Sequence, residues 1–354
     1  MLSLSKQDTS IMKGIAICAM LFHHLYCSIP KWISPYGGVL YCLGDLGKVC
    51  VSLFLFCSGY GLSCQFGKVV SVKGTAKFMI KRFTSFYLNY WVVFVVFVPI
   101  TVLVFHRPLT VPYGENVNIW KCLVLDFLGV LGGHSYNITW WFNKLIIILW
   151  LLFPFVFWCV NKMPLLSLIG SFFIARFWMS IIGWDYYGEL YLYQFSFVLG
   201  MFCKIWGAKW SGVWNCLSGK PTLFSIISVC LVTFFVYVRM KPVIPHWSGV
   251  RIDAFLSWSI ALLVLSLIRY TRFLSRVLSF LGKHSGNIYL IHTFFNGYWH
   301  PEWLHTSSFM RSGVNFVVLL GLSLLTSALL EEMKERMGIY ALSRRIIDKI
   351  CRNL

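Results

Sequence analysis

The chain has 354 residues, of which 58% are hydrophobic and 12% charged, and its formal net charge is +19. Soluble globular domains carry about 25% charged residues, so this composition indicates a protein of the lipid bilayer. The basic residues stand in short segments between apolar runs and form no patch within a soluble domain. This distribution argues against nucleic acid as a partner and is typical of membrane topology signals.

The twelve cysteines lie mostly in apolar segments, and no two have the spacing Cys-x-x-Cys. We therefore expect no metal site, and we interpret the cysteines as side chains that pack between helices. The first apolar run contains a lysine and two histidines and lacks a small-residue cleavage site. No cleavable signal peptide is expected there.

Hydropathy predicts about ten spans of the length that a bilayer requires. They lie near residues 11–29, 44–66, 83–105, 139–160, 164–183, 190–208, 222–240, 250–268, 276–297 and 312–331. A shorter apolar stretch, 119–131, is expected to lie at the interface or to re-enter the membrane. The predicted fold is an all-α polytopic transmembrane helix bundle over residues 1–333. The tail, 334–354, is basic and amphipathic and is expected on the inner membrane surface.

Loop charges give the orientation of the predicted bundle. With the N-terminus inside, the inner segments hold 21 of the 31 lysines and arginines, and the outer segments hold seven. Among the outer cations are Lys31 and Lys241, and the inner group includes Lys68. Because cytoplasmic loops collect positive charge, this excess predicts an even number of spans with both termini in the cytoplasm.

The first predicted span carries two ionisable residues eleven positions apart, Lys13 and His24. Eleven steps of about 100° bring them within about 20° of one helix face, and they lie about 16 Å apart along the axis. Intramembrane ionisable groups are candidates for function, and a histidine is a plausible general base near neutral pH. The alternatives are a lysine that extends to the headgroups and a histidine that bonds to a neighbouring helix. His23 points about 80° away from Lys13 and is interpreted as a packing residue.

The second span carries Ser58 beside Gly59 and Gly61. The glycines allow either close helix approach or a local break, and Ser58 could form a hydrogen bond at a site. The basic stretch that follows contains Lys77, Lys81 and Arg82. It either enforces topology or binds phosphate, since arginine offers a rigid fork to phosphate oxygens and lysine a point charge.

Further polar residues lie inside or beside the later spans. Asp253 could orient a catalytic base, but we favour an ion pair with Arg251, and His292 is interpreted as an interhelical hydrogen-bonding residue. Three tryptophans, at 140, 141 and 299, are assigned to aromatic belts in preference to sugar stacking. The remaining polar residues of this kind are Lys48, Lys144 and Arg176.

Five segments together resemble one family in order and spacing. They are Lys13 to His24, Ser58 to Tyr60, Lys81 to Trp91, Thr139 to Phe142 and Leu281 to His292. The chain from Ser10 to about Phe295 is similar to acyltransferase family 3, bacterial ten-helix membrane proteins that O-acylate cell-surface glycans with cytoplasmic acyl-CoA. One departure is Ser85, where the family often has a second basic residue three positions after Arg82.

The resemblance implies a membrane O-acyltransferase, with acetyl as the expected group, in the bacterial cytoplasmic membrane. Its substrates would be acyl-CoA (acetyl-CoA as the expected co-substrate) and a surface polysaccharide or a lipid-linked glycan precursor, with no permanently bound cofactor. His24 would activate the acceptor hydroxyl, with Lys13 and Ser58 as further catalytic residues. Ser58 or His24 would be the nucleophile if an acyl-enzyme forms.

The resemblance also assigns the basic stretch. Lys77, Lys81 and Arg82 would bind the phosphates of acyl-CoA at the inner membrane surface. A different hypothesis is a transporter or flippase that moves a glycan or an acyl donor without chemistry. A transporter with a proton relay needs intramembrane carboxylates, and the chain has only 12 acidic residues in all, few of them inside spans. This scarcity favours the enzyme.

Overall fold

The computed structural model describes residues 3–27, 39–67, 69, 71–181, 188–210, 212, 216, 219–240, 246–299, 304 and 309–352. Lys31, Lys68, Lys241 and the side chain of Arg176 lie outside this description. The chain forms two compact units. Unit 1 comprises residues 1–23, 38–68 and 151–283, and unit 2 comprises residues 24–37, 69–150 and 284–354.

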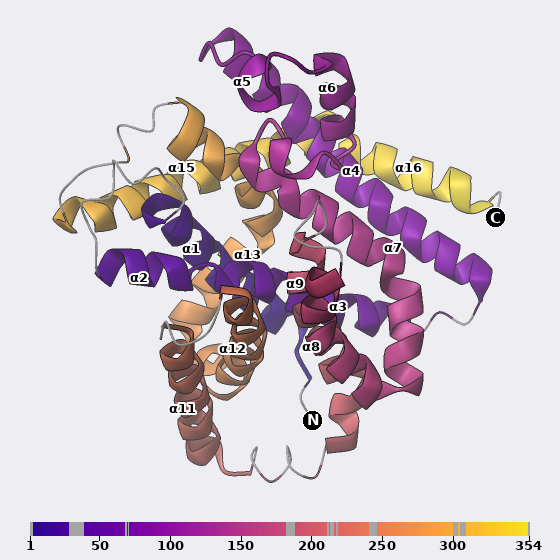
Figure 1. The fold of residues 1–354 in the computed structure, drawn as a ribbon, viewed down its shortest axis with the longest axis vertical. Helices are drawn as coiled ribbons and strands as arrows, with labels where there is room; N and C mark the ends of the chain where they lie inside the picture. The colour runs from indigo at the N-terminus through magenta and orange to yellow at the C-terminus, as the bar shows by residue number, and fades with distance from the viewer. Residues whose placement is uncertain are drawn as a thin grey trace. The chain divides into compact units, whose positions relative to one another are not determined.

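The described residues form helices and connecting turns, with no β-strand among them, which confirms the predicted all-α class (Figure 1). The long helices are α1 (Lys6–Tyr26), α3 (Val49–Phe66), α4 (Val72–Leu103), α7 (Trp141–Lys162), α8 (Pro164–Ile181), α9 (Gly188–Trp206), α11 (Pro221–Met240), α12 (His246–Ser266), α13 (Arg272–Thr293) and α15 (Phe309–Arg336). The others are α2 (Val39–Leu46), α5 (Thr110–Tyr113), α6 (Ile119–Phe127), η2 (Gly132–His134), η3 (Ile138–Trp140), η4 (Gly207–Trp210), η5 (Ile268–Tyr270), the π-helical η6 (Phe294–Trp299) and α16 (Ile339–Arg352).

Each of the ten predicted spans coincides with one of the long helices. Within the described residues, six segments are long and apolar enough to cross a bilayer. They are Leu40–Phe66, Val72–Leu103, Ile138–Lys162, Pro221–Met240, Gly249–Tyr270 and Gly313–Arg336. The protein is therefore a multi-pass helical membrane protein, and the count of about ten spans stays a prediction.

In unit 1, α3 and α9 approach each other at two glycines. A Cβ atom on Gly59 would lie 2.1 Å from the carbonyl oxygen of Phe197, and one on Gly200 would lie 2.2 Å from that of Phe56. Only glycine fits at such positions, as is usual where membrane helices pack closely. Because α3 is continuous from Val49 to Phe66, Gly59 permits close approach and makes no break.

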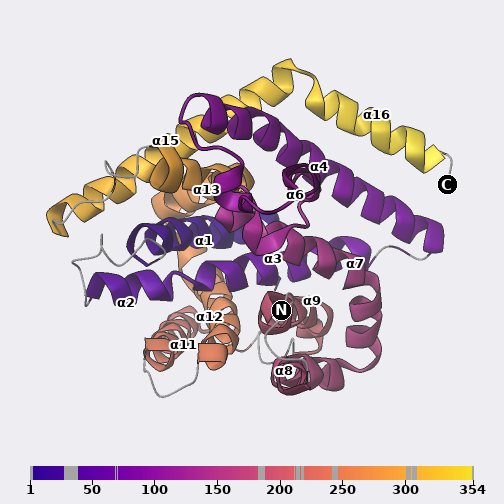
Figure 2. The ribbon, with the colours of Figure 1, turned by 45° about the horizontal axis from the view of Figure 1, so that its top comes forward.

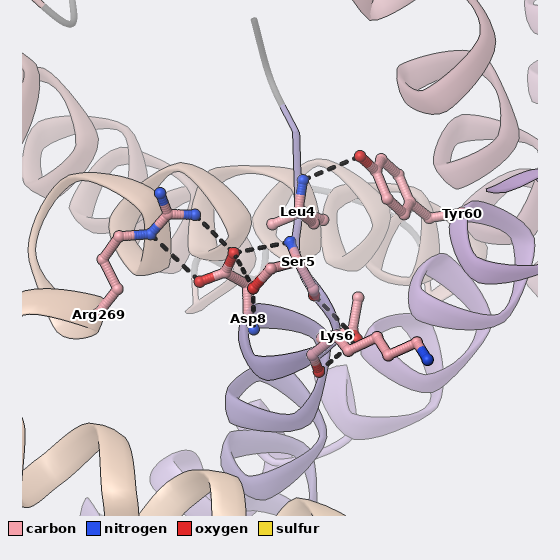
Figure 3. Close-up of polar contacts among 7 residues, drawn as sticks. Leu4, Ser5, Lys6, Asp8, Tyr60 and Arg269 are labelled. Atoms are coloured by element: carbon pink, nitrogen blue, oxygen red, sulfur yellow. Dashed lines mark hydrogen bonds and ion pairs between the residues drawn. The ribbon is translucent and has the colours of Figure 1, made fainter.

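The start of α1 is held within unit 1 by a set of polar contacts (Figure 3). The Asp8 carboxylate accepts the Ser5 N–H at 2.8 Å, while the Ser5 hydroxyl accepts the Asp8 N–H at 3.1 Å. This reciprocal pair is a capping box. Arg269 donates to the same carboxylate at 3.2 Å, and the Tyr60 hydroxyl accepts the Leu4 N–H at 2.9 Å. The first turn of α1 is thereby fixed.

A second ionic cluster in unit 1 joins α2, α11 and α12. The Arg239 guanidinium lies 3.0 Å from Asp45 and 3.0 Å from Asp253, and Lys48 lies 2.8 Å from Asp45. The Asp253 side chain is 1% exposed, so its charge depends on Arg239 for compensation.

The predicted ion pair between Asp253 and Arg251 is wrong. Residues two apart on a helix are separated by about 200° around its axis and do not face each other. Asp253 instead pairs with Arg239, and the Arg251 guanidinium lies over the ring of Phe172, 4.7 Å from its centroid.

Unit 2 is built around an aromatic core that α4, α13 and the connection before α7 share. Its buried residues are Tyr90, Val93, Phe94, Phe97, Val98, Tyr113, Leu131, Tyr136, Trp140, Leu290, Ile291, Phe294 and Leu330. The assignment of Trp140 to an aromatic belt is wrong, because Trp140 is 1% exposed and its indole N–H donates to the carbonyl of Leu290 at 3.0 Å. Burial with a satisfied N–H fixes this tryptophan inside the bundle.

The apolar stretch 119–131 packs along α4 within unit 2. The Tyr87 hydroxyl donates to the carbonyl of Leu128 at 3.1 Å, and the Trp91 indole donates to that of Phe127 at 2.8 Å. Tyr87 lies near the middle of α4, about 22 Å from its first residue, Val72. Protein donors thus satisfy carbonyls at the end of this segment, and its two predicted placements, at the interface or re-entering the membrane, stay predictions.

The C-terminal segment of unit 2 consists of α15 and α16. Both views show α16 alongside α4 (Figures 1 and 2). Lys334 is 1% exposed and donates to Asn287 at 2.8 Å, to Glu331 at 2.9 Å and also to Asn89. The predicted tail boundary before Lys334 therefore falls inside α15, which ends at Arg336. The chain turns at Gly338, whose φ of 67° suits glycine.

Candidate functional site

His24 and its predicted partner Lys13 lie on the same continuous helix, α1. Both side chains are half-buried. The helix supports the predicted separation of about 16 Å between them on one face. Lys13 belongs to unit 1 and His24 to unit 2.

The structure brings His24 together with a second histidine in unit 2. The ring of His292, on α13, lies with its centroid 4.9 Å from that of His24 and is tilted by 53°. His292 is fully buried, whereas His24 is partly accessible. The two imidazoles are in ring contact, and only His24 of the two has an exposed surface for a substrate.

Hydrogen bonds within α13 determine the tautomer of His292. Its Nδ1 lies 3.1 Å from the carbonyl of Ile288 and 3.0 Å from that of Tyr289. Since carbonyl oxygens only accept, Nδ1 carries the hydrogen. Nε2 lies 3.3 Å from the Thr293 hydroxyl. The interhelical hydrogen bond expected for His292 is wrong, because these partners all belong to its own helix.

The Thr293 hydroxyl extends this set of contacts toward the start of α7. It lies 3.2 Å from the Thr139 hydroxyl, which donates to Asn137 Oδ1 at 2.7 Å. The Asn137 amide donates to the carbonyl of Leu290 at 3.3 Å. The Thr139 segment, noted in the sequence for its motif, therefore supports α13 beside His292.

His23 takes a packing position, as interpreted from its phase on the helix. Its Nδ1 donates to the carbonyl of Gly44 at 2.9 Å. In the same unit, Ser58 is half-buried on α3. The structure thus places Ser58 and Lys13 in unit 1, and it places His24 and the basic residues of α4 in unit 2.

The basic stretch belongs to the first turns of α4. Lys77 and Lys81 are exposed and lie about 40° apart around the helix axis, as residues at i and i+4 do. Arg82 turns inward, and its guanidinium lies 4.5 Å from the centroid of the Trp150 ring. The three predicted phosphate ligands therefore separate into two exposed lysines and one arginine that stacks on an aromatic face. Ser85 is exposed on the lysine face.

Sequence reasoning missed a buried amide in unit 2. Asn143 on α7 is 1% exposed, and neither its Oδ1 nor its Nδ2 has a hydrogen-bond partner. A buried amide without partners costs free energy, so such a group is a candidate ligand contact. Its position directly after the Thr139–Phe142 motif is the one signal that could have pointed to it.

Comparison with known families identifies the class of protein. The family model described as an acyltransferase domain, acyltransferase family 3, matches residues 9–332. The chain belongs to this family and is a membrane acyltransferase. No curated protein and no solved structure matches the chain. The transporter hypothesis loses its basis, because the match covers nearly all of the helical bundle.

Proposed function

We propose that the protein is an O-acyltransferase that moves an acyl group from cytoplasmic acyl-CoA to a hydroxyl of a surface polysaccharide or lipid-linked glycan precursor. Acetyl is the group we assign, and the bacterial cytoplasmic membrane is the location. The observation that carries this proposal is His24, half-buried on α1 and in ring contact with a second imidazole. The family match gives the class of reaction.

In this mechanism His24 is the general base. It takes the proton of the acceptor hydroxyl while the oxygen attacks the acyl carbon, and the thiolate of CoA leaves. Ser58 is the proposed nucleophile if the reaction passes through an acyl-enzyme. Lys13, about 16 Å from His24 along α1, is the third proposed catalytic residue, and its charge would face the polar part of the donor.

The donor's phosphates are assigned to the start of α4. Lys77 and Lys81 are exposed cations on one face of the helix and suit phosphate oxygens. Arg82 would contribute from its stacked position over Trp150. The positive charge of these segments also favours contact with the inner membrane surface, where acyl-CoA would arrive.

The test is the O-acyl content of surface polysaccharide, measured by proton NMR before and after mild base. Cells would carry the wild type, H24A, H23A or an empty vector. We expect base-labile acyl signals with the wild type and with H23A, whose imidazole donates to a backbone carbonyl, and none with H24A. If cells with H24A contain as much of the protein in the membrane as wild-type cells and their polysaccharide is fully acylated, His24 has no part in the mechanism.

A further inference from the structure

We propose that His292 is a positioning residue for His24. Its neutral imidazole holds the His24 ring and stabilises the imidazolium that forms when His24 takes the acceptor's proton. This inference rests on the proposed function of His24 as the base. It gives a reaction-specific role to a fully buried histidine on α13.

The first support is the ring contact. The centroids of His24 and His292 are 4.9 Å apart with a tilt of 53°, and both residues belong to unit 2. A cation within about 6 Å of an aromatic face is attracted to it, and the attraction grows when water is excluded. His292 is 0% exposed, so its ring meets that condition.

The second support is that Nδ1 of His292 is committed to carbonyls of its own helix. Nδ1–H donates to the carbonyls of Ile288 and Tyr289, and Nε2 lies 3.3 Å from the Thr293 hydroxyl. With His24 protonated, a second proton on His292 would put two cations about 5 Å apart, which is unfavourable in a buried site. The pair therefore carries at most one positive charge, and that charge resides on His24.

The transfer balances with a single mobile proton. The acceptor's O–H bond breaks and its proton passes to His24, while the new C–O bond forms and the C–S bond of the thioester breaks. The departing thiolate takes the proton from His24 and leaves as CoA. His292 acts only through His24, because its own nitrogens are committed to α13 and Thr293.

Three variants separate the ring from its hydrogen bonds. H292F keeps an aromatic face and loses both nitrogens. H292N keeps a donor for the Ile288 carbonyl and loses the ring, and H292A loses both. We expect kcat to fall about 3-fold in H292F and about 30-fold or more in H292N and H292A, with the KM for acetyl-CoA within about 2-fold of the wild type.

Both constants come from steady-state assays of purified protein in detergent or nanodiscs, with acetyl-CoA and surface polysaccharide that mild base has deacylated. Thermal unfolding of each variant monitors folding. If H292N equals or exceeds H292F in kcat, the imidazole serves only the backbone of α13 and the proposal is overturned. Wild-type kcat in all three variants would also overturn it.

A parallel H24A sample separates this inference from the proposed function. An inactive H24A with a fully active H292N would refute the role of His292 alone, and an active H24A would refute both. Should the His292 variants fail to fold, ¹⁵N NMR of histidine-labelled wild type decides. The spectrum of the wild type must show His292 as a neutral ring with its hydrogen on Nδ1, and the same signal must persist in H24A. A doubly protonated His292 would contradict the proposal.

Discussion

Ser85 occupies a position on α4 where another cation would extend an existing row. Lys73, Lys77, Lys81 and Ser85 follow each other at intervals of four residues, and all four are exposed. Four steps on a helix return to nearly the same face, so the three lysines present their charges along one stripe. Arg82 lies about 100° away and stacks on Trp150.

We predict that S85R lowers the KM for acyl-CoA by about 3- to 10-fold, since one more charged hydrogen bond to phosphate contributes about 1 kcal/mol. The turnover number should stay within about 2-fold, because Ser85 lies on the face of the lysines. Steady-state kinetics with acyl-CoA as the varied substrate measures both. S85Q is the matched control, and equal KM values for S85R and S85Q would refute a phosphate site on this stripe.

At the scale of elements, ion pairs between charged side chains connect three helices of unit 1. Arg239 at the end of α11 reaches Asp45 on α2 and Asp253 on α12. The Asp253 side chain is 1% exposed and that of Arg239 is 14% exposed, so the pair is shielded from water. Removing the arginine would leave a buried carboxylate without compensation.

We therefore expect R239M to lower the free energy of unfolding by about 3 kcal/mol, and D253N added to R239M to recover most of that loss. Denaturation of the detergent-solubilised protein, followed by tryptophan fluorescence, measures it. K48M is the control, because the Lys48 side chain is 32% exposed and such pairs contribute below about 1 kcal/mol. A loss in R239M no larger than that in K48M would show that Asp253 is compensated elsewhere.

For the whole molecule, the distribution of charge sets the topology. The predicted inner segments hold three times as many basic residues as the outer ones, and six of them stand from Lys334 onward. Positive segments are retained in the cytoplasm, so both termini should lie there. The connection between α5 and α6, exposed at Glu115, should lie on the opposite side.

Reporter fusions test this arrangement. Alkaline phosphatase inserted at Glu115 should be active, and the same enzyme at the C-terminus should be inactive, with a difference of about 10-fold or more. Green fluorescent protein at the C-terminus should fluoresce, because it folds in the cytoplasm. Activity at both positions would require an even number of spans between Glu115 and the C-terminus, where seven are predicted, and would contradict the predicted count.

From the sequence alone it could be predicted that the protein lies in the lipid bilayer, that it is helical, where each long helix lies and which family it resembles. The first three follow from composition and hydropathy, which are local to the chain, and the family follows from the resemblance of five motif segments to known sequences. The shared helix of Lys13 and His24 and the packing position of His23 could likewise be predicted, because a continuous helix fixes the angle between its own residues.

Only the tertiary structure decided which faces of different helices meet. Arg239, not Arg251, pairs with Asp253, Trp140 is buried, and the His292 ring contacts His24. Hydropathy and helical period describe one helix at a time and contain no information on its neighbour's rotation or depth. Close packing between helices sets those relations, as it does in unit 1 where Gly59 of α3 meets the backbone of α9 at Phe197.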